Sequence, residues 1–238
     1  LNLGKYQRQH YIYDKNKDDQ INLEKQEKEF EDLILRAYNA KEIDGFKTIH
    51  GKKGDRFVSL GTLPLQDGDA AAKELERGVK ELGLKGFQIL GTVDGHELSD
   101  PILDPFWEIA EKLDTLIFLH PNGYPQGDRL KNHYFNNVIG NPLDTTVALH
   151  HLIFEGTLEK FKNLKILVAH GGGYLPAYSG RIDHAWGARP DCRIKIKSPP
   201  TSYLKKLYFD TIVFTYEQLD YLVQMFGSDH IVMGTDYP

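Results

Sequence analysis

From residue 56 onward the chain alternates between short apolar runs and longer segments in which apolar residues recur with a helical period. Several of the short runs are continuously apolar, which is typical of strands that are buried on both faces of a parallel sheet. Six strands are predicted, at residues 57–63, 84–90, 116–120, 165–170, 207–213 and 231–236.

Helices are predicted between most of these strands. The pairs Asp104-Pro105 and Asn141-Pro142 each mark a helix start, because proline fits the first helical turn. The second of these helices is predicted to run through about residue 154. Two further segments place their apolar residues on one helical face: Ala71, Leu75, Val79 and Leu82 in the first, and Leu219, Leu222, Val223 and Phe226 in the second. Strands that alternate with helices predict βαβ units with right-handed crossovers.

This pattern predicts an α/β fold, a (β/α)8 TIM-type barrel that lacks its first strands and its last helix in this chain. Residues 1–55 are interpreted as a divergent polar arm and an amphipathic helix at about 21–43, and residues 56–238 as the barrel domain. The alternative is an open doubly wound sheet, which usually carries a glycine-rich nucleotide loop after its first strand. The sequence there is Gly61-Thr62-Leu63-Pro64 rather than GxGxxG, and this favours the barrel.

Composition and charge are those of an ordinary folded domain. The 238 residues are 40% hydrophobic and include 29 Lys and Arg against 34 Asp and Glu, a net charge of −5. This mildly acidic balance offers no broad attraction for nucleic acid, and no apolar run reaches the ~18 residues of a membrane span. The single cysteine, Cys192, excludes an internal disulfide framework and a cysteine-built metal site. We therefore expect a cytoplasmic protein without nucleic-acid or membrane partners.

Three of the predicted strands end in groups that bind metals or move protons. These groups are His120, His170 and Asp236. In a barrel the carboxyl ends of the strands surround one mouth, so side chains far apart in sequence can meet there, and imidazole and carboxylate ligands suit Zn²⁺, Mn²⁺ or Fe²⁺. The alternative for each residue alone is a hydrogen-bonded structural role. Three such groups after three strands favour a shared site, and the three glycines after His170 indicate a close approach of the backbone to another group.

Arg181 follows His170 by 11 residues. A guanidinium near a metal site suits a substrate carboxylate, which it can hold through two parallel hydrogen bonds. The alternative is a surface salt bridge, for example with Asp183. Two other features are weaker: His96-Glu97 begins an HExxH motif that Asp100 breaks, and the basic stretch 189–206 is interpreted mainly as a solvated loop.

Four motifs together resemble the amidohydrolase-related metal-dependent decarboxylases, of the aminocarboxymuconate-semialdehyde decarboxylase type. They are the run from Arg56 to Pro64, the pair His120-Pro121, the run His170-Gly171-Gly172-Gly173 with Gly180-Arg181 after it, and the run from Gly234 to Pro238. The resemblance covers about residues 56–238. It implies a distorted (β/α)8 barrel in which the six predicted strands are the third to the eighth.

The resemblance also implies a role for each candidate residue. His120 and Asp236 are the ligands of one divalent metal ion, zinc in the first place and manganese as the alternative. His170 is the catalytic histidine that orients or deprotonates the ion's water. Arg181 binds the substrate carboxylate in the site of a neighbouring subunit, which implies a homodimer. Members of the family also carry a His-x-His pair of ligands on their first strand, and no His-x-His occurs in this sequence.

The function implied by the resemblance is metal-dependent, non-oxidative decarboxylation of a small unsaturated or aromatic carboxylic acid. The same constellation also serves hydrolysis of an amide, ester or lactone, so a metal-dependent hydrolase is the alternative among enzymes. A third alternative, favoured by the absent His-x-His, is a truncated, non-catalytic barrel fragment with a role in assembly.

Overall fold

The computed structural model of the chain describes residues 58–236. The amphipathic helix predicted at about 21–43 lies outside these residues. Six strands form one sheet whose order along the sheet follows the order in the chain. They are β1 (Leu60–Gly61), β2 (Gly86–Ile89), β5 (Leu116–Leu119), β6 (Lys165–Val168), β7 (Tyr208–Asp210) and β8 (Ile231–Val232). Every neighbouring pair is parallel, which confirms the predicted six parallel strands.

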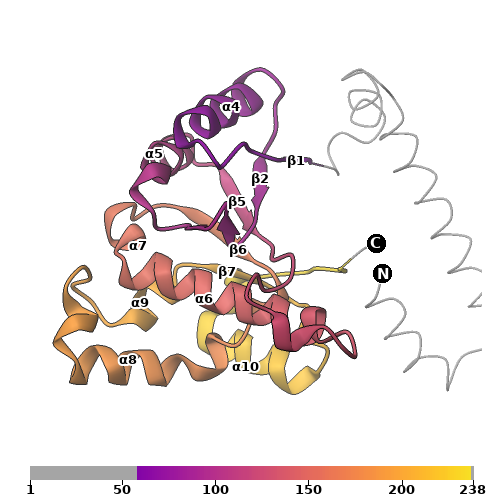
Figure 1. Cartoon of the computed structure of the whole chain (residues 1–238), viewed down its shortest axis with the longest axis vertical. Helices are drawn as coiled ribbons and strands as arrows, with labels where there is room; N and C mark the ends of the chain where they lie inside the picture. The colour runs from indigo at the N-terminus through magenta and orange to yellow at the C-terminus, as the bar shows by residue number, and fades with distance from the viewer. Residues whose placement is uncertain (1–57, 237–238) are drawn as a thin grey trace, which may run out of the picture. The chain divides into compact units, whose positions relative to one another are not determined.

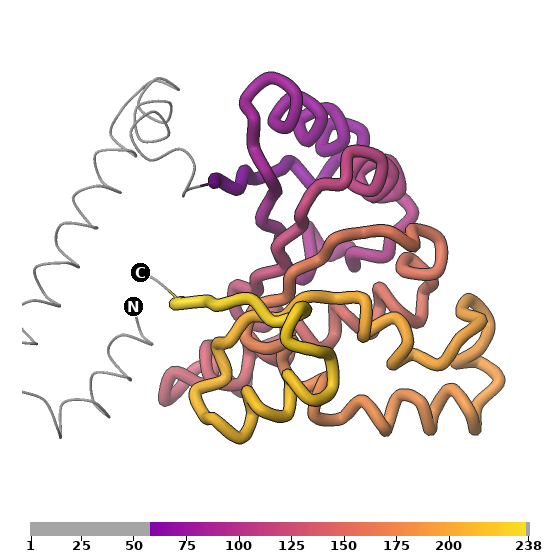
Figure 2. The backbone as a smooth tube through the Cα atoms, turned by 180° about the vertical axis from the view of Figure 1, so that it is seen from behind, coloured from indigo at the N-terminus to yellow at the C-terminus, as the bar shows by residue number. Residues whose placement is uncertain are grey.

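The unbroken strand order identifies the fold. An open doubly wound sheet reverses its strand order at a switch point, whereas each strand here pairs with the next one of the sheet. The described residues therefore hold six consecutive strands of a (β/α)8 barrel, and the doubly wound alternative is excluded. In Figure 1 the labelled strands β1, β2, β5, β6 and β7 follow one another in the order of the chain, and Figure 2 shows the same course of the backbone from behind.

The strands are shorter than the apolar runs that predicted them. Residues 57–63 were expected as one strand, but only Leu60–Gly61 pairs with β2. Beyond it, Leu65 is buried and Leu63 packs against the core without strand pairing. Buried positions carry apolar residues whether or not their backbone pairs with a neighbouring strand. Apolar runs in the sequence therefore overestimate the length of the strands.

The four predicted helices are confirmed, except that the first ends before Leu82. They are α4 (Gly68–Lys80), α5 (Asp104–Lys112), α6 (Asn141–Phe154) and α10 (Tyr216–Phe226). The prolines at 105 and 142 lie in the first turns of α5 and α6, as expected. In α4 the Asp67 side chain caps the helix by accepting a hydrogen bond from the backbone N–H of Ala70 at 3.0 Å. Helices α4 and α5 pack against each other, and Figures 1 and 2 show the pair from opposite sides.

Several shorter elements were not predicted. A two-stranded antiparallel hairpin, β3 (Thr92–Val93) with β4 (His96–Glu97), follows β2. Three more α-helices are α7 (Thr157–Lys160), α8 (Ser179–Ala188) and α9 (Pro200–Leu204). The single-turn helices are η1 (Pro101–Leu103), η2 (Asp128–Leu130), the π-helix η3 (Asn136–Gly140), η4 (His170–Gly172), η5 (Pro176–Tyr178), η6 (Pro190–Arg193) and η7 (Ser228–His230). No helix within residues 58–236 is long and apolar enough to cross a membrane.

The interpretation of residues 189–206 as mainly a solvated loop is correct for most of the segment, which is exposed, but wrong for its last part. The segment contains α9, and the side chains of Ile196, Tyr203 and Leu204 belong to the core. The Tyr203 hydroxyl donates a hydrogen bond to the Glu159 carboxylate, so the polar end of a buried ring is satisfied. The lysines and arginines of the segment concealed these buried positions in the sequence.

Asp144, in the first turn of α6, is a buried carboxyl group with 4% of its surface exposed. It lies so close to Gly91 that a Cβ atom on that glycine would come within 2.1 Å of Asp144 Oδ2. Burial and, to a smaller extent, the nearby Glu97 carboxylate together raise the pKa of Asp144 from 3.8 to about 6.

We expect Asp144→Asn to stabilise the protein at pH 8 and to leave its stability unchanged at pH 3.5. A carboxyl group with a raised folded-state pKa holds a proton that the unfolded chain releases, so the free energy of unfolding falls as pH rises from about 4 to about 6. At ~1.4 kcal/mol per pKa unit, the gain at pH 8 is at most about 3 kcal/mol. Urea unfolding at both pH values measures it. Asp128→Asn, at an exposed carboxylate, is the control that should change little; a destabilised Asp144→Asn at pH 8 would contradict the expectation.

Candidate metal centre

The two candidate histidines lie directly beyond neighbouring strands. His120 follows β5, and its backbone N–H continues the ladder by donating to the carbonyl of Ile89 at 2.9 Å. His170 comes two residues after the end of β6, where the Ala169 N–H donates to the Leu119 carbonyl at 3.0 Å. Because β5 and β6 are parallel neighbours, the two rings meet at the same end of the sheet, with centroids 5.0 Å apart and planes at 64°.

The third candidate, Asp236, lies four residues beyond β8. His120, His170 and Asp236 each offer one ligand atom, and these three atoms lie within 4.8 Å of one another. All three side chains are partly buried. The structure therefore brings together the groups that the sequence placed at three strand ends.

This donor set fits a divalent transition-metal ion. Two imidazole nitrogens and one carboxylate oxygen are ligands that Zn²⁺ and Mn²⁺ accept. Zinc binds such atoms at about 2.0–2.2 Å, so two ligands of one ion lie at most about 4 Å apart. The three ligand atoms are already within 4.8 Å of one another, close to the spacing of groups that surround one ion.

The glycines after His170 are required by the chain's own packing. Gly171, Gly172 and Gly173 all have positive φ angles, a region that favours glycine. A Cβ on Gly172 would lie 2.7 Å from the ring of Phe209, and one on Gly173 would lie 2.3 Å from the carbonyl oxygen of Pro142. The close approach predicted from the three glycines is thus an approach to β7 and to the start of α6.

Asp210 is a residue of this site that the sequence analysis missed. It ends β7 and is 6% exposed. Its Oδ2 accepts a hydrogen bond from the His170 N–H at 3.0 Å, and its Oδ1 accepts from the N–H groups of Gly171 at 2.9 Å and Ile212 at 3.0 Å. Burial raises the pKa of Asp210, and these three N–H donors together with His170 act in the opposite direction. An acidic residue at a strand end was the available signal, the same one that selected Asp236.

Arg181 is not part of the cluster of His120, His170 and Asp236. It lies in the first turn of α8, and its side chain is exposed. The alternative of a salt bridge with Asp183 is not what the structure has, because the Asp183 carboxylate accepts hydrogen bonds from Thr201 instead, at 2.9 Å from its N–H and 2.6 Å from its hydroxyl.

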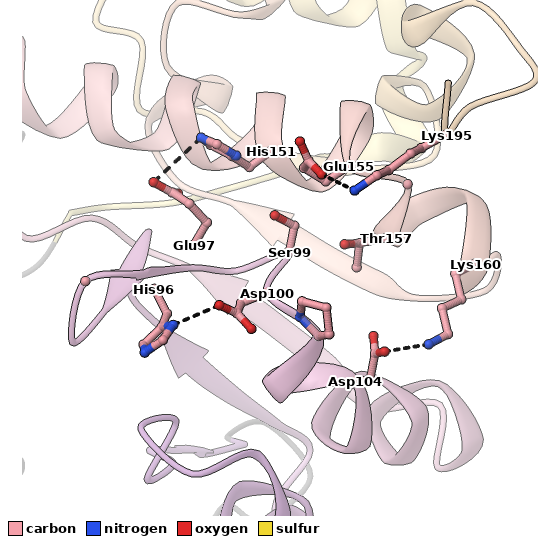
Figure 3. A pocket seen from close by; sticks show the side chains of 13 residues that line it. His96, Glu97, Ser99, Asp100, Asp104, His151, Glu155, Thr157, Lys160 and Lys195 are labelled. Carbon is pink, nitrogen blue, oxygen red and sulfur yellow. Dashed lines mark hydrogen bonds and ion pairs between the residues drawn. The ribbon is translucent and has the colours of Figure 1, made fainter. Parts of the chain in front are cut away.

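A pocket of about 460 Å³ lies elsewhere and does not include the three candidate ligands. Figure 3 shows that its charged side chains face one another in pairs. Lys160 binds Asp104 at 2.6 Å, and His96 binds Asp100 at 2.8 Å, so the histidine of the incomplete HExxH motif has a carboxylate partner. The charged side chains of this pocket are therefore paired with one another.

The family of the chain follows from this fold and this cluster. A family model described as "Amidohydrolase" matches residues 44–238, and the chain belongs to that family. The resemblance seen in the four sequence motifs is confirmed.

Among curated relatives, the chain is 40% identical over 184 residues to 2-amino-3-carboxymuconate-6-semialdehyde decarboxylase of Dictyostelium discoideum, a match that covers 77% of the chain and 51% of the relative. It is 31% identical over 210 residues to gamma-resorcylate decarboxylase of Rhizobium sp. (strain MTP-10005), covering 79% of the chain and 61% of the relative. The chain thus spans about half to three fifths of the length of these relatives.

Solved structures agree. The 2,6-dihydroxybenzoate decarboxylase from Rhizobium matches with a TM-score of 0.74 and 31% identity, over 82% of this chain and 65% of that one. A dihydroxybenzoic acid decarboxylase from Polaromonas sp. JS666, solved with bound manganese and the inhibitor 2-nitroresorcinol, matches with a TM-score of 0.73 and 30% identity, over 82% of this chain and 63% of that one.

Proposed function

We propose that the chain is a metal-dependent, non-oxidative decarboxylase of a small unsaturated or aromatic carboxylic acid. The observation that carries the proposal is the cluster of His120, His170 and Asp236 at the carboxyl ends of the barrel strands. The names of the relatives support the same reaction, because the curated ones and the solved ones cited above are decarboxylases of small carboxylic acids.

In this proposal His120 and Asp236 hold one divalent ion. Zinc remains the first choice for such ligands, and the manganese in the Polaromonas structure supports the alternative. When bound, the ion would supply Lewis-acid chemistry, polarising substrate oxygens and lowering the pKa of water.

The chain's own residues then handle the carboxylate and the proton. The bond between the carboxylate carbon and the substrate framework breaks, carbon dioxide leaves, and the unsaturated framework accepts the electron pair. His170 delivers the proton that replaces the carboxylate, as an imidazole can near neutral pH. Its ring lies 5.0 Å from that of His120, so a substrate held at the cluster is within its reach.

Arg181 has its proposed role in a neighbouring subunit. Its exposed position on α8 suits a contact with another chain, and in a two-fold homodimer each arginine would hold the substrate carboxylate in its partner's site. We also propose a cytoplasmic location, which the single cysteine supports, and no nucleic-acid or membrane partner.

The test is to load the full chain with Mn²⁺ or Zn²⁺ and to measure carbon dioxide release from 2,6-dihydroxybenzoate and related aromatic acids. Release that depends on the metal supports the decarboxylase. Cleavage of amide, ester or lactone probes without carbon dioxide release would instead identify the hydrolase. If the folded, metal-loaded chain does neither, the non-catalytic reading is favoured.

Metal affinity gives a separate expectation. A catalytic zinc site usually has three protein ligands; His120 and Asp236 are the two that we assign, and the sequence has no His-x-His. We therefore expect this chain to bind Mn²⁺ weakly, and His120→Ala to bind it at least ~10-fold more weakly still. Electron paramagnetic resonance of free Mn²⁺ measures both. Tight stoichiometric binding by the unaltered chain would show that His170 or another group completes the ligand set.

A further inference from the structure

Two strands are connected at the candidate site by one buried carboxylate. Asp210 ends β7, yet two of its three hydrogen bonds go to the consecutive backbone N–H groups of His170 and Gly171, which follow β6. The third goes to the N–H of Ile212, two residues further along its own chain. Because Ile212 shares an oxygen with Gly171, the carboxylate is itself fixed while it holds the turn after β6.

The turn at His170 needs such support. His170 has a φ angle of 55°, in the left-handed region that side chains other than glycine rarely adopt. Gly171 continues the turn with a φ angle of 59°. A strained backbone conformation persists where surrounding contacts fix it. Here the N–H groups of His170 and Gly171 donate charge-assisted hydrogen bonds to the buried Asp210 carboxylate.

The conformation of this turn also sets the direction of the imidazole. The backbone angles of a residue fix its Cα–Cβ bond, so a different conformation at His170 would point the ring elsewhere. In the present conformation the ring meets His120 edge to face, and one of its nitrogens lies within 4.8 Å of ligand atoms from His120 and Asp236.

We propose that Asp210 is a positioning residue for the proposed decarboxylation: its carboxylate holds the backbone turn at His170 and thereby aims the imidazole at His120 and Asp236. That this positioning matters for catalysis rests on the proposed function. Its structural claim, that Asp210 sets the direction of the His170 ring, is tested without turnover.

The variant is Asp210→Asn in the full chain, which keeps the size of the side chain. The amide has only one acceptor oxygen, so its NH2 group must face one set of N–H donors, either that of His170 or those of Gly171 and Ile212. The matched control is Asp183→Asn. Asp183 is a partly buried carboxylate that, like Asp210, accepts a hydrogen bond from a backbone N–H of another element, that of Thr201 in α9.

The decisive readout is the nuclear Overhauser effect between the ring protons of His120 and His170 in the metal-free protein. We expect it to fall at least twofold in Asp210→Asn and to persist in Asp183→Asn. If Asp210→Asn loses thermal stability but keeps the ring contact, the role of Asp210 is merely structural and the proposal is overturned.

A second measurement covers the case in which Asp210→Asn does not fold. In the unaltered protein the amides of His170 and Gly171 should exchange with solvent as slowly as those of β6, because both are bonded to a buried carboxylate. Exchange at the rate of exposed turns would overturn the proposal. A loss of ring contact in Asp210→Asn, in a chain that shows no decarboxylation at all, would leave the positioning role intact and overturn only the proposed function.

Discussion

His170→Asn is expected to lower the rate of carbon dioxide release at least ~100-fold at saturating metal and substrate, because general acid–base catalysis by one side chain contributes about 10²–10⁴. Asparagine is polar and close to histidine in reach, but it neither gains nor gives a proton near pH 7. The measurement is the initial rate with Mn²⁺ present, together with the circular dichroism spectrum and the melting temperature.

The control for this variant is His96→Asn. His96 bonds to Asp100 in the pocket of Figure 3, so the substitution removes an imidazole and a histidine–carboxylate contact outside the candidate metal centre. We expect its rate to stay within about twofold of the unaltered chain. A His170→Asn variant that is folded and keeps its rate would refute the role of His170 as the proton donor.

Arg181→Ala is expected to be nearly inactive, with its defect in substrate binding rather than in folding. The exposed side chain contributes little to the core, whereas a bidentate contact with a carboxylate needs the planar guanidinium. Arg181→Lys keeps the positive charge but loses the two parallel N–H donors of the guanidinium, so its substrate binding should also be impaired. The comparison of KM with the unfolding free energy for both variants separates binding from stability.

Mixing subunits tests whether this arginine acts across an interface. In a heterodimer of Arg181→Ala and His170→Ala chains, one site carries both defects and the other carries neither. Random pairing of equal amounts makes half of the dimers mixed, so about one quarter of the unaltered activity should return. If heterodimers form, as native mass spectrometry would show, and no activity returns, the composite site is wrong.

The strand ends could be predicted from the sequence, because each combines the end of a buried apolar run with a residue that can bind a metal or move a proton. A continuously apolar run that stops at His120 or His170 shows where the sheet ends and what projects beyond it, and the structure places the two rings 5.0 Å apart. Helix α6 begins at residue 141, as the Asn141-Pro142 pair predicted, because proline restricts where a helix can start.

Other features were missed for identifiable reasons. The β3–β4 hairpin is signalled by Asp94-Gly95, whose positive φ angles of 51° and 80° are those that a tight turn requires, but its two strands have only two residues each. Asp210 accepts only backbone N–H groups, and which of them lie within reach depends on the tertiary fold. Helix α9 is short, and the exposed lysines around it dominate the composition of the segment.

Gly172 and Phe209 are 37 residues apart in the sequence, but their side chains would occupy the same space. The ring of Phe209 fills the space where a side chain at 172 would stand, and it packs against the ring of Phe226 of α10 at 4.6 Å between centroids. Across related sequences, glycine at the first position and a large ring at the second should therefore covary. The φ angle of Gly172, 83°, disfavours a side chain there even if residue 209 became smaller. The ring of Phe209 fills the space that this glycine leaves, so the conformation of the His170 turn constrains an interior position of the next strand.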